Sequence, residues 1–174
     1  LAPPWVSNLE ERQCQECTLQ LPTWSPHFCV VVQAGTKDRA ELDSVDDLDA
    51  VKQHWESEPA GTRYSSSTEA VEFYYEARAA RYELEPFIKS FAEFDSAKSL
   101  EVLEIGVGIG ADFSNWVTTG AIATGIDLTA AAIEHTRAHL DSLGVERDRY
   151  ELRQANAEEL PFPDNSFDMV YSWG

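Results

Sequence analysis

The chain has 174 residues, a length that suits one ordinary domain with a short additional segment. Its 31 acidic and 13 basic side chains give a formal net charge of −18, which repels phosphate backbones and anionic lipid surfaces. No apolar run reaches the roughly 18 residues of a membrane span, and no basic stretch leads into an apolar one near the start. Composition therefore predicts a cytoplasmic protein that binds neither nucleic acid nor a membrane.

Residues 1–40 are predicted to form an irregular N-terminal appendage, because proline and tryptophan are scattered there without sustained periodicity. The segment contains four possible zinc ligands, Cys14, Cys17, His27 and Cys29. Unpaired thiols are the alternative interpretation, and we favour it over a metal site. The odd cysteine count argues against a closed disulfide framework.

Residues 41–99 predict a helical N-terminal cap region. A first helix begins after Ser44 and ends before Pro59. Its apolar side chains recur at helical spacing on one face, namely Val45, Leu48, Val51 and Trp55. A second helix begins after Ser67, and Pro86 starts a third in its first turn. The second has its own helical spacing of side chains, at Val71, Tyr74, Tyr75, Arg78 and Tyr82.

From residue 100 the pattern changes to alternating strands and helices. Strands are predicted at 100–105, 121–127, 150–155 and 167–173, with helices at 111–119 and 128–144. Repeated strand–helix–strand order implies right-handed crossovers. The predicted fold class is therefore α/β, a Rossmann-like parallel sheet with flanking helices over residues 100–174.

A glycine-rich turn follows the first of these strands, and two ligand classes use such a turn. Gly106, Gly108 and Ala111 fit the dinucleotide pattern, with Asp127 about 20 residues later to hold a ribose. Glu104 with Gly106, Gly108 and Gly110 instead gives the pattern E-x-G-x-G-x-G. The glycines alone do not decide between a nicotinamide-dependent oxidoreductase and the second class.

Three blocks together carry a resemblance to a known family. VLEIGVGIG, then GIDLT at 125–129, then NAEELPFPDNSFDMVYSWG at 156–174 resemble the class I S-adenosylmethionine-dependent methyltransferases, in the branch that modifies small molecules. The third block has no role in an oxidoreductase. The resemblance therefore implies S-adenosylmethionine as cofactor and methyl transfer to a small-molecule acceptor.

The resemblance also implies which residues bind the cofactor. Glu104 would lie beneath the methionine end, where the three glycines let backbone approach the ligand, and Asp127 would accept hydrogen bonds from both ribose hydroxyls. Leu128 would lie against the adenine face. The expected cofactor-binding residues are Glu104, Gly106, Gly108, Gly110, Asp127, Leu128, Asn156, Ala157 and Ser172.

The adenine end departs from the family at one position. Asn156 stands where the family usually has aspartate, so it can accept the adenine amino group only without charge assistance, a loss of about 1 kcal/mol. Ala157 would donate its N–H to a ring nitrogen. No catalytic base is assigned, because the sulfonium brings its own leaving group and the protein mainly positions the reactants.

The family's domain continues past a fourth strand, so the resemblance implies that this chain is a fragment whose fourth strand forms an exposed apolar edge. A non-catalytic, truncated binding module is the alternative, and the oligomeric state stays open.

Several other side chains are given structural roles. His135 and His139 are expected on a solvated helix face, and Asp112 beside the N-terminus of its helix. Tyr64 fits a lid over the cofactor and a packing role equally well. Six other aromatic residues are expected in the core, namely Trp55, Tyr74, Tyr75, Tyr82, Trp116 and Trp173.

Overall fold

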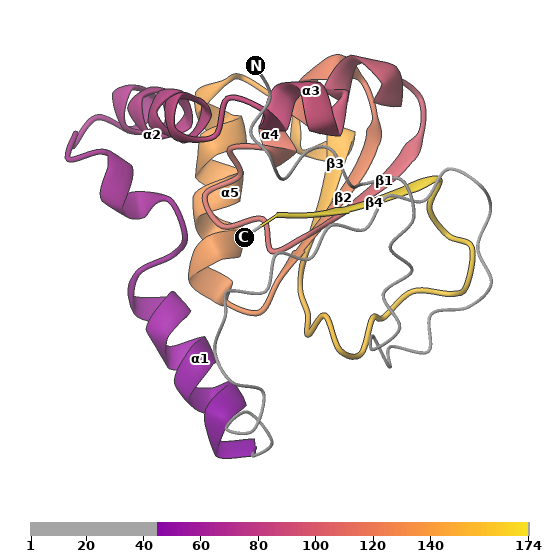
Figure 1. Ribbon diagram of the computed structural model, residues 1–174, viewed down its shortest axis with the longest axis horizontal. Coiled ribbons are helices and arrows are strands. Elements are labelled where there is room, and N and C mark those ends of the chain that lie inside the picture. Colours follow the sequence, from indigo (N-terminus) through magenta and orange to yellow (C-terminus); the bar gives the residue numbers. More distant parts are fainter. Residues whose placement is uncertain (1–44, 174) are drawn as a thin grey trace, which may run out of the picture.

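The computed structural model describes residues 45–173, with side chains from Leu48 onward (Figure 1). The α-helices in chain order are α1 Val45–Ser57, α2 Ala70–Leu84, α3 Ile88–Ala92, α4 Phe113–Thr119 and α5 Ala130–Ser142. Three short 3-10 turns accompany them, η3 Thr62–Tyr64, η4 Phe94–Ala97 and η5 Arg147–Arg149. The strands are β1 Glu101–Ile105, β2 Ile122–Asp127, β3 Tyr150–Gln154 and β4 Met169–Ser172. Each predicted helix and strand that lies within these residues is present.

The four strands form one parallel sheet in the order β3-β2-β1-β4. The chain runs from β1 through α4 to β2 and through α5 to β3. It then crosses back, so that β4 pairs with the other side of β1. Both helices pack on β2 and contact each other, as expected when two right-handed crossovers proceed in the same direction. The predicted α/β class is confirmed. Among the described residues β4 lies at the sheet edge, where Tyr171 is buried and the other side chains of the strand are half-buried.

The core lies between the sheet and α4. Phe113 and Trp116 of α4 are fully buried, and Trp116 packs on Phe94 with ring centroids 4.3 Å apart. At the centre of β2, Gly125 leaves room for this packing, because a Cβ there would lie 2.7 Å from Val107 and 2.8 Å from Phe113. A close-packed interior cannot absorb such a contact. The glycine therefore sets how closely the loop after β1 approaches the sheet.

The cap helices bury different faces from those the spacing predicts. On α1, Leu48, Val51 and Trp55 are 37%, 40% and 42% exposed. On α2, Tyr74 and Ala77 are buried, whereas Val71 and Tyr75 point to solvent. Since α2 packs along α5, its buried stripe follows the neighbour's position rather than the most apolar side chains.

A carboxylate links α1 to the start of α5. The Glu56 side chain accepts hydrogen bonds from the backbone N–H groups of Ala130 (3.1 Å) and Ala131 (3.3 Å). These N–H groups have no partner within their own helix, and an acid there is also favoured by the helix dipole. The contact fixes the end of α1 beside the carboxyl end of β2.

The expectation that His135 and His139 lie on a solvated face is wrong, because α2 covers that face of α5. His139 is 2% exposed, its ring stacks on Tyr74 with centroids 4.7 Å apart, and its Nδ1 lies 3.0 Å from the Ile109 carbonyl oxygen. His135 Nδ1 lies 3.1 Å from the Tyr74 hydroxyl. Facing a carbonyl, Nδ1 of His139 must carry its proton and donate it.

Burial lowers the pKa of His139 to about 4, against an ordinary value of 6.5. Between these values the unfolded chain binds a proton that the folded chain does not, so the free energy of unfolding falls as pH is lowered. Over the whole window the loss amounts to about 3 kcal/mol. We expect urea unfolding at a series of pH values from 7 to about 4 to show it.

Carboxylates titrate in the same pH range, so the comparison with His139→Gln isolates the histidine. Glutamine can still donate to the Ile109 carbonyl but takes up no proton. We expect this variant to lose less stability on acidification than wild type, by about 3 kcal/mol. His54→Gln, at an exposed position of α1, is the matched control and should keep the wild-type slope. Equal slopes in all three proteins would contradict the assignment.

Part of the prediction falls outside residues 45–173. The appendage at 1–40, the possible zinc ligands within it and Ser44 are among the residues not described, and the boundary between 41–99 and 100–174 stays a prediction. In the described range, no group of three or more His, Cys, Asp or Glu side chains is arranged to hold a metal ion. None of the helices in that same range has the length and apolar content needed to span a bilayer.

Candidate functional site

Strand register brings the predicted site residues to one edge of the sheet. Ile105 of β1 pairs with Ile126 of β2 and Ser172 of β4, and Asp127 pairs with Gln154. The carboxyl ends of all four parallel strands therefore lie side by side. In open α/β sheets this edge is where ligands bind.

The turn after β1 is built on three glycines with positive φ angles, 79° at Gly106, 53° at Gly108 and 75° at Gly110. They make different contacts. A Cβ on Gly106 would meet nothing within 4 Å, so the backbone there faces open space. A Cβ on Gly108 would lie 2.9 Å from the Ala60 carbonyl oxygen, and one on Gly110 would lie 2.8 Å from Thr136 Cγ2. Gly106 leaves space for a ligand, whereas Gly110 leaves space for α5.

Asp127 is held in place at the end of β2. Its Oδ2 accepts a hydrogen bond from Gly108 N–H at 3.1 Å. Its Oδ1 accepts from Thr129 N–H at 3.0 Å and from the Thr129 hydroxyl at 2.9 Å. The Thr129 hydroxyl in turn accepts from Ala132 N–H in the first turn of α5. The carboxylate is thus oriented next to the glycine loop, and of its roughly four lone-pair sites one, on Oδ2, is still available to a ligand.

Glu104 is 3% exposed, and its Oε2 accepts a hydrogen bond from the Trp116 indole N–H at 2.8 Å. Burial, together with the negative charge of nearby Asp112, raises the pKa of Glu104 well above its usual range. A buried acid without a paired cation favours its neutral form. A cation brought next to it would favour ionisation, so the group suits a site for a positively charged ligand.

Four more residues were expected to bind the cofactor, namely Leu128, Asn156, Ala157 and Ser172, and three of them are engaged in local structure. Asn156 Oδ1 accepts from Glu158 N–H at 3.0 Å, which closes an Asx-type turn. The Leu128 carbonyl accepts from the Gln154 side chain at 2.9 Å. Ser172 donates its hydroxyl hydrogen to the Ile105 carbonyl at 3.1 Å, and Ala157 is exposed. These contacts place the four residues near the strand ends, and their cofactor roles stay predictions.

A cavity of about 700 Å³ opens beside the glycine loop. Glu104, Gly106 and Gly108 line it, whereas Gly110, Asp127 and the residues expected at the adenine end do not. The cap region forms the opposite wall. Its lining side chains there include Trp55, Tyr64, Arg81 and Glu85, with Trp173 from the end of the sheet. The cavity thus covers the part of the site where the methionine end was expected.

This position corrects the expected role of some aromatic residues. Trp116 and Tyr74 are core residues, as predicted. Trp55 and Trp173 instead line the cavity, and Tyr75 is 71% exposed. Tyr64 lies on the cavity wall, where its lid and packing roles both remain compatible with its half-buried ring.

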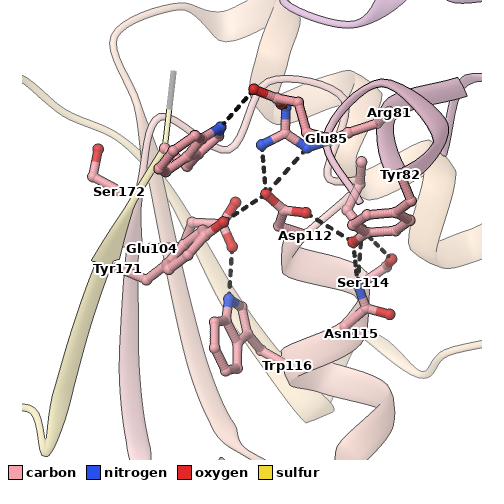
Figure 2. A network of polar contacts seen from close by, with 12 residues as sticks. Arg81, Tyr82, Glu85, Glu104, Asp112, Ser114, Asn115, Trp116, Tyr171 and Ser172 are labelled. Atoms are coloured by element: carbon pink, nitrogen blue, oxygen red, sulfur yellow. Dashed lines mark hydrogen bonds and ion pairs between the residues drawn. The ribbon is translucent and has the colours of Figure 1, made fainter. Parts of the chain in front are cut away.

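Asp112 lies at the N-terminus of its helix, as predicted, and its side chain also has partners in other elements. It occupies the residue before α4, but its side chain makes no cap hydrogen bond. Figure 2 shows its carboxylate at the centre of a network of donors from other elements. Oδ2 accepts from Arg81 Nε (3.1 Å), Arg81 Nη2 (2.6 Å) and the Tyr171 hydroxyl (2.9 Å), and Oδ1 accepts from the Tyr82 hydroxyl (2.8 Å).

Arg81 and Glu85 are site residues that the sequence did not reveal. Both lie in the region of α2, four residues apart, a spacing that by itself indicates only a surface ion pair. Their place on the cavity wall depends on how α2 packs over the glycine loop. The one hint in the sequence is that Arg81 and Asp112 carry opposite charges. No local sequence pattern predicts that two residues so far apart in the chain form a pair.

Comparison with known proteins assigns the second part of the chain to a family. Residues 102–174 match the family described as "Methyltransferase domain". A phosphatidylethanolamine N-methyltransferase of Cereibacter sphaeroides is 39% identical over 75 residues, which cover 43% of this chain and 36% of that protein. A ubiquinone/menaquinone biosynthesis C-methyltransferase of Psychromonas ingrahamii is 38% identical over 76 residues, covering 42% of this chain and 30% of that protein. The chain thus spans about a third of the length of these relatives.

A solved structure supports the fold independently. Magnesium protoporphyrin IX methyltransferase from Synechocystis PCC 6803 with bound SAM superposes with a TM-score of 0.53, over 75% of this chain and 62% of that one. At 13% sequence identity the likeness concerns the fold alone.

Residues 102–174 thus match a methyltransferase domain model, and this match, the relatives and the parallel sheet with its glycine loop support a class I S-adenosylmethionine-dependent methyltransferase. The resemblance seen in the sequence is confirmed. The oxidoreductase interpretation of the glycine loop is set aside, because the family match extends through the third block.

Proposed function

We propose that this chain binds S-adenosylmethionine and forms the cofactor-binding part of an enzyme that transfers its methyl group to a small-molecule acceptor. The observation that carries the proposal is the open glycine loop, which lines a cavity of about 700 Å³ and is bonded through Gly108 to the fixed carboxylate of Asp127. The bound cofactor would supply a methyl group on a sulfonium centre, which is its own leaving group. The chain's residues have the simpler task of binding and orientation.

Each part of the ligand has a group of fitting chemistry. The open space next to Gly106 lets part of the ligand lie against the backbone. A side chain at this position would fill that space. The site left on Asp127 Oδ2 fits a hydroxyl donor of a ribose. Glu104 lies under the loop, where a positive charge above it would be favoured. The cavity wall formed by α1 and α2 would exclude water from the reacting atoms.

A small-molecule acceptor is favoured over nucleic acid by charge. The formal net charge of −18 disfavours contact with a phosphate backbone. The two relatives named above act, by their names, on phosphatidylethanolamine and in quinone biosynthesis. A cytoplasmic location belongs to the same proposal, since three cysteines do not form a closed set of disulfides and suit a reducing compartment.

Ligand binding tests the proposal directly. We expect S-adenosylmethionine and S-adenosylhomocysteine to raise the melting temperature, by the equivalent of about 2.7 kcal/mol at 100 times Kd. Asp127→Asn should weaken S-adenosylhomocysteine binding in calorimetry about 100-fold, because the hydrogen bond to the ligand loses the charge of its acceptor. Asp148→Asn, an exposed aspartate in η5, is the matched control and should bind as wild type does. No thermal shift with either ligand, or tighter binding of NADH, would overturn the proposal.

A further inference from the structure

The cap wall of the cavity presents two opposite charges side by side. Arg81, in the last turn of α2, and Glu85, just after the helix, lie one helical turn apart, and both line the cavity (Figure 2). Their side chains are 22% and 35% exposed, so each is neither free in solvent nor sealed in the core. The glycine loop lines the same cavity.

The Arg81 guanidinium is held from one side only. Asp112 accepts from Nε at 3.1 Å and from Nη2 at 2.6 Å, through a single carboxylate oxygen. Nη1 has a much weaker contact, 3.4 Å from Glu85 Oε2. Asp112 therefore fixes the plane of the guanidinium while a second donor edge remains available to a ligand.

Of the two carboxylate oxygens of Glu85, one is likewise held by a neighbour and the other is available to a ligand. Oε1 accepts from the Trp173 indole N–H at 3.1 Å, which orients the carboxylate. Among residues 45–173, the one contact of Oε2 is the long one to Arg81. At 3.4 Å this contact is at the long end for a hydrogen bond and contributes little to stability, so a ligand can separate the half-buried pair at small cost.

Arg63 also lines the cavity but has no comparable frame. It is exposed, and its guanidinium lies over the ring of its sequence neighbour Tyr64 at 5.0 Å and donates to that residue's hydroxyl. Its side chain is tied only to the adjacent residue of η3. Arg81 is thus the lining arginine whose orientation is set by a buried partner.

We propose that Arg81 and Glu85 together recognise the zwitterionic amino-acid end of the cofactor, Arg81 Nη1 binding its carboxylate and Glu85 Oε2 its ammonium group. The assignment rests on the proposed function. The assignment follows from charge complementarity. Arg81 and Glu85 lie one helical turn apart, and the ligand carries its carboxylate and its ammonium group on one carbon atom. Glu104, below the loop, adds a second group that favours the ammonium side.

Three adenosine ligands separate this role from a structural one. S-Adenosylhomocysteine carries both charges, decarboxylated S-adenosylhomocysteine only the ammonium, and 5′-methylthioadenosine neither. We expect Arg81→Gln to weaken S-adenosylhomocysteine about 10- to 100-fold in calorimetry and to leave the other two ligands unchanged. Glu85→Gln should weaken both ammonium-bearing ligands by a similar factor and leave 5′-methylthioadenosine unchanged.

Glu85→Gln also guards against misfolding, because its amide oxygen can still accept from Trp173, whereas Arg81→Gln leaves Asp112 with fewer donors. Glu83→Gln removes the same charge from an exposed position of α2 and should change none of the three affinities. Equal losses for 5′-methylthioadenosine and S-adenosylhomocysteine, or no loss for either, would overturn the inference. Wild-type binding of 5′-methylthioadenosine as tight as that of S-adenosylhomocysteine would overturn it while the proposed function stands. Wild type that binds none of the three ligands would overturn both.

Discussion

Replacing Asp112 by alanine is expected to lower the free energy of unfolding by about 3–5 kcal/mol. The carboxylate is 3% exposed and accepts four hydrogen bonds, from Arg81, Tyr82 and Tyr171. Its loss leaves a partly buried guanidinium and the buried Tyr171 hydroxyl without this acceptor, while the Tyr82 hydroxyl keeps the Ala111 carbonyl at 3.2 Å. The donors come from α2 and β4, so the substitution weakens the contact between the cap region and the sheet. We expect the loss as a lower free energy of unfolding in urea.

Two comparisons make this expectation specific. Asp95→Ala removes an exposed carboxylate in η4 and should change stability by no more than about 0.5 kcal/mol. Combining Asp112→Ala with Arg81→Met removes both charges, so the double variant should cost less than the sum of the single ones. Additive losses would show that the two side chains act independently, contrary to the 2.6 Å contact between them.

Valine substitutions at Gly106 and Gly110 are expected to separate ligand binding from stability. Each places a branched side chain at a positive φ angle, which costs about 1–3 kcal/mol in strain. At Gly106 the side chain would enter open space by the cavity, so we expect S-adenosylhomocysteine binding to be lost while the fold survives. At Gly110 it would meet Thr136, which adds about 1–3 kcal/mol of overpacking.

Two measurements are made on each variant. Urea unfolding gives its stability, and calorimetric titration gives its affinity for S-adenosylhomocysteine at a temperature where both variants are folded. We expect Gly110→Val to be the less stable protein and still to bind the ligand. If Gly110→Val lost binding while keeping wild-type stability, its glycine would belong to the ligand surface instead. Gly144→Val, at positive φ beyond α5 with no atom near its Cβ, controls for strain alone.

Sequence reasoning succeeded where structure depends on neighbours along the chain. The strands from Glu101 and Ile122 and the helix from Ala130 follow from short apolar runs bounded by glycine and capping residues. Parallel pairing then brings Glu104 and Asp127 to one edge, because each sits near a strand end.

It failed where a side chain's surroundings depend on tertiary packing. His139 is polar and at helical spacing with His135, so its burial depends on α2 lying over that face. Leu48 and Trp55 are apolar at helical spacing, yet α1 leaves them partly exposed. The Arg81–Asp112 pair joins residues of two elements that no periodicity relates. Charge complementarity becomes visible only once α2 is placed against the loop after β1.

The hydrogen bond from Gly108 to Asp127 joins the first two strand-to-helix turns into one unit. With Thr129 holding the other oxygen, the rotamer of Asp127 is set before any ligand arrives. Binding then avoids the entropy loss of about 0.5–1.5 kcal/mol that a freely rotating side chain would suffer. Since Thr129 also caps α5, the helix and the glycine loop are thermodynamically coupled through this carboxylate. A ligand that binds Asp127 would therefore contact the unit that holds the first turn of α5, the same helix end to which Glu56 attaches α1.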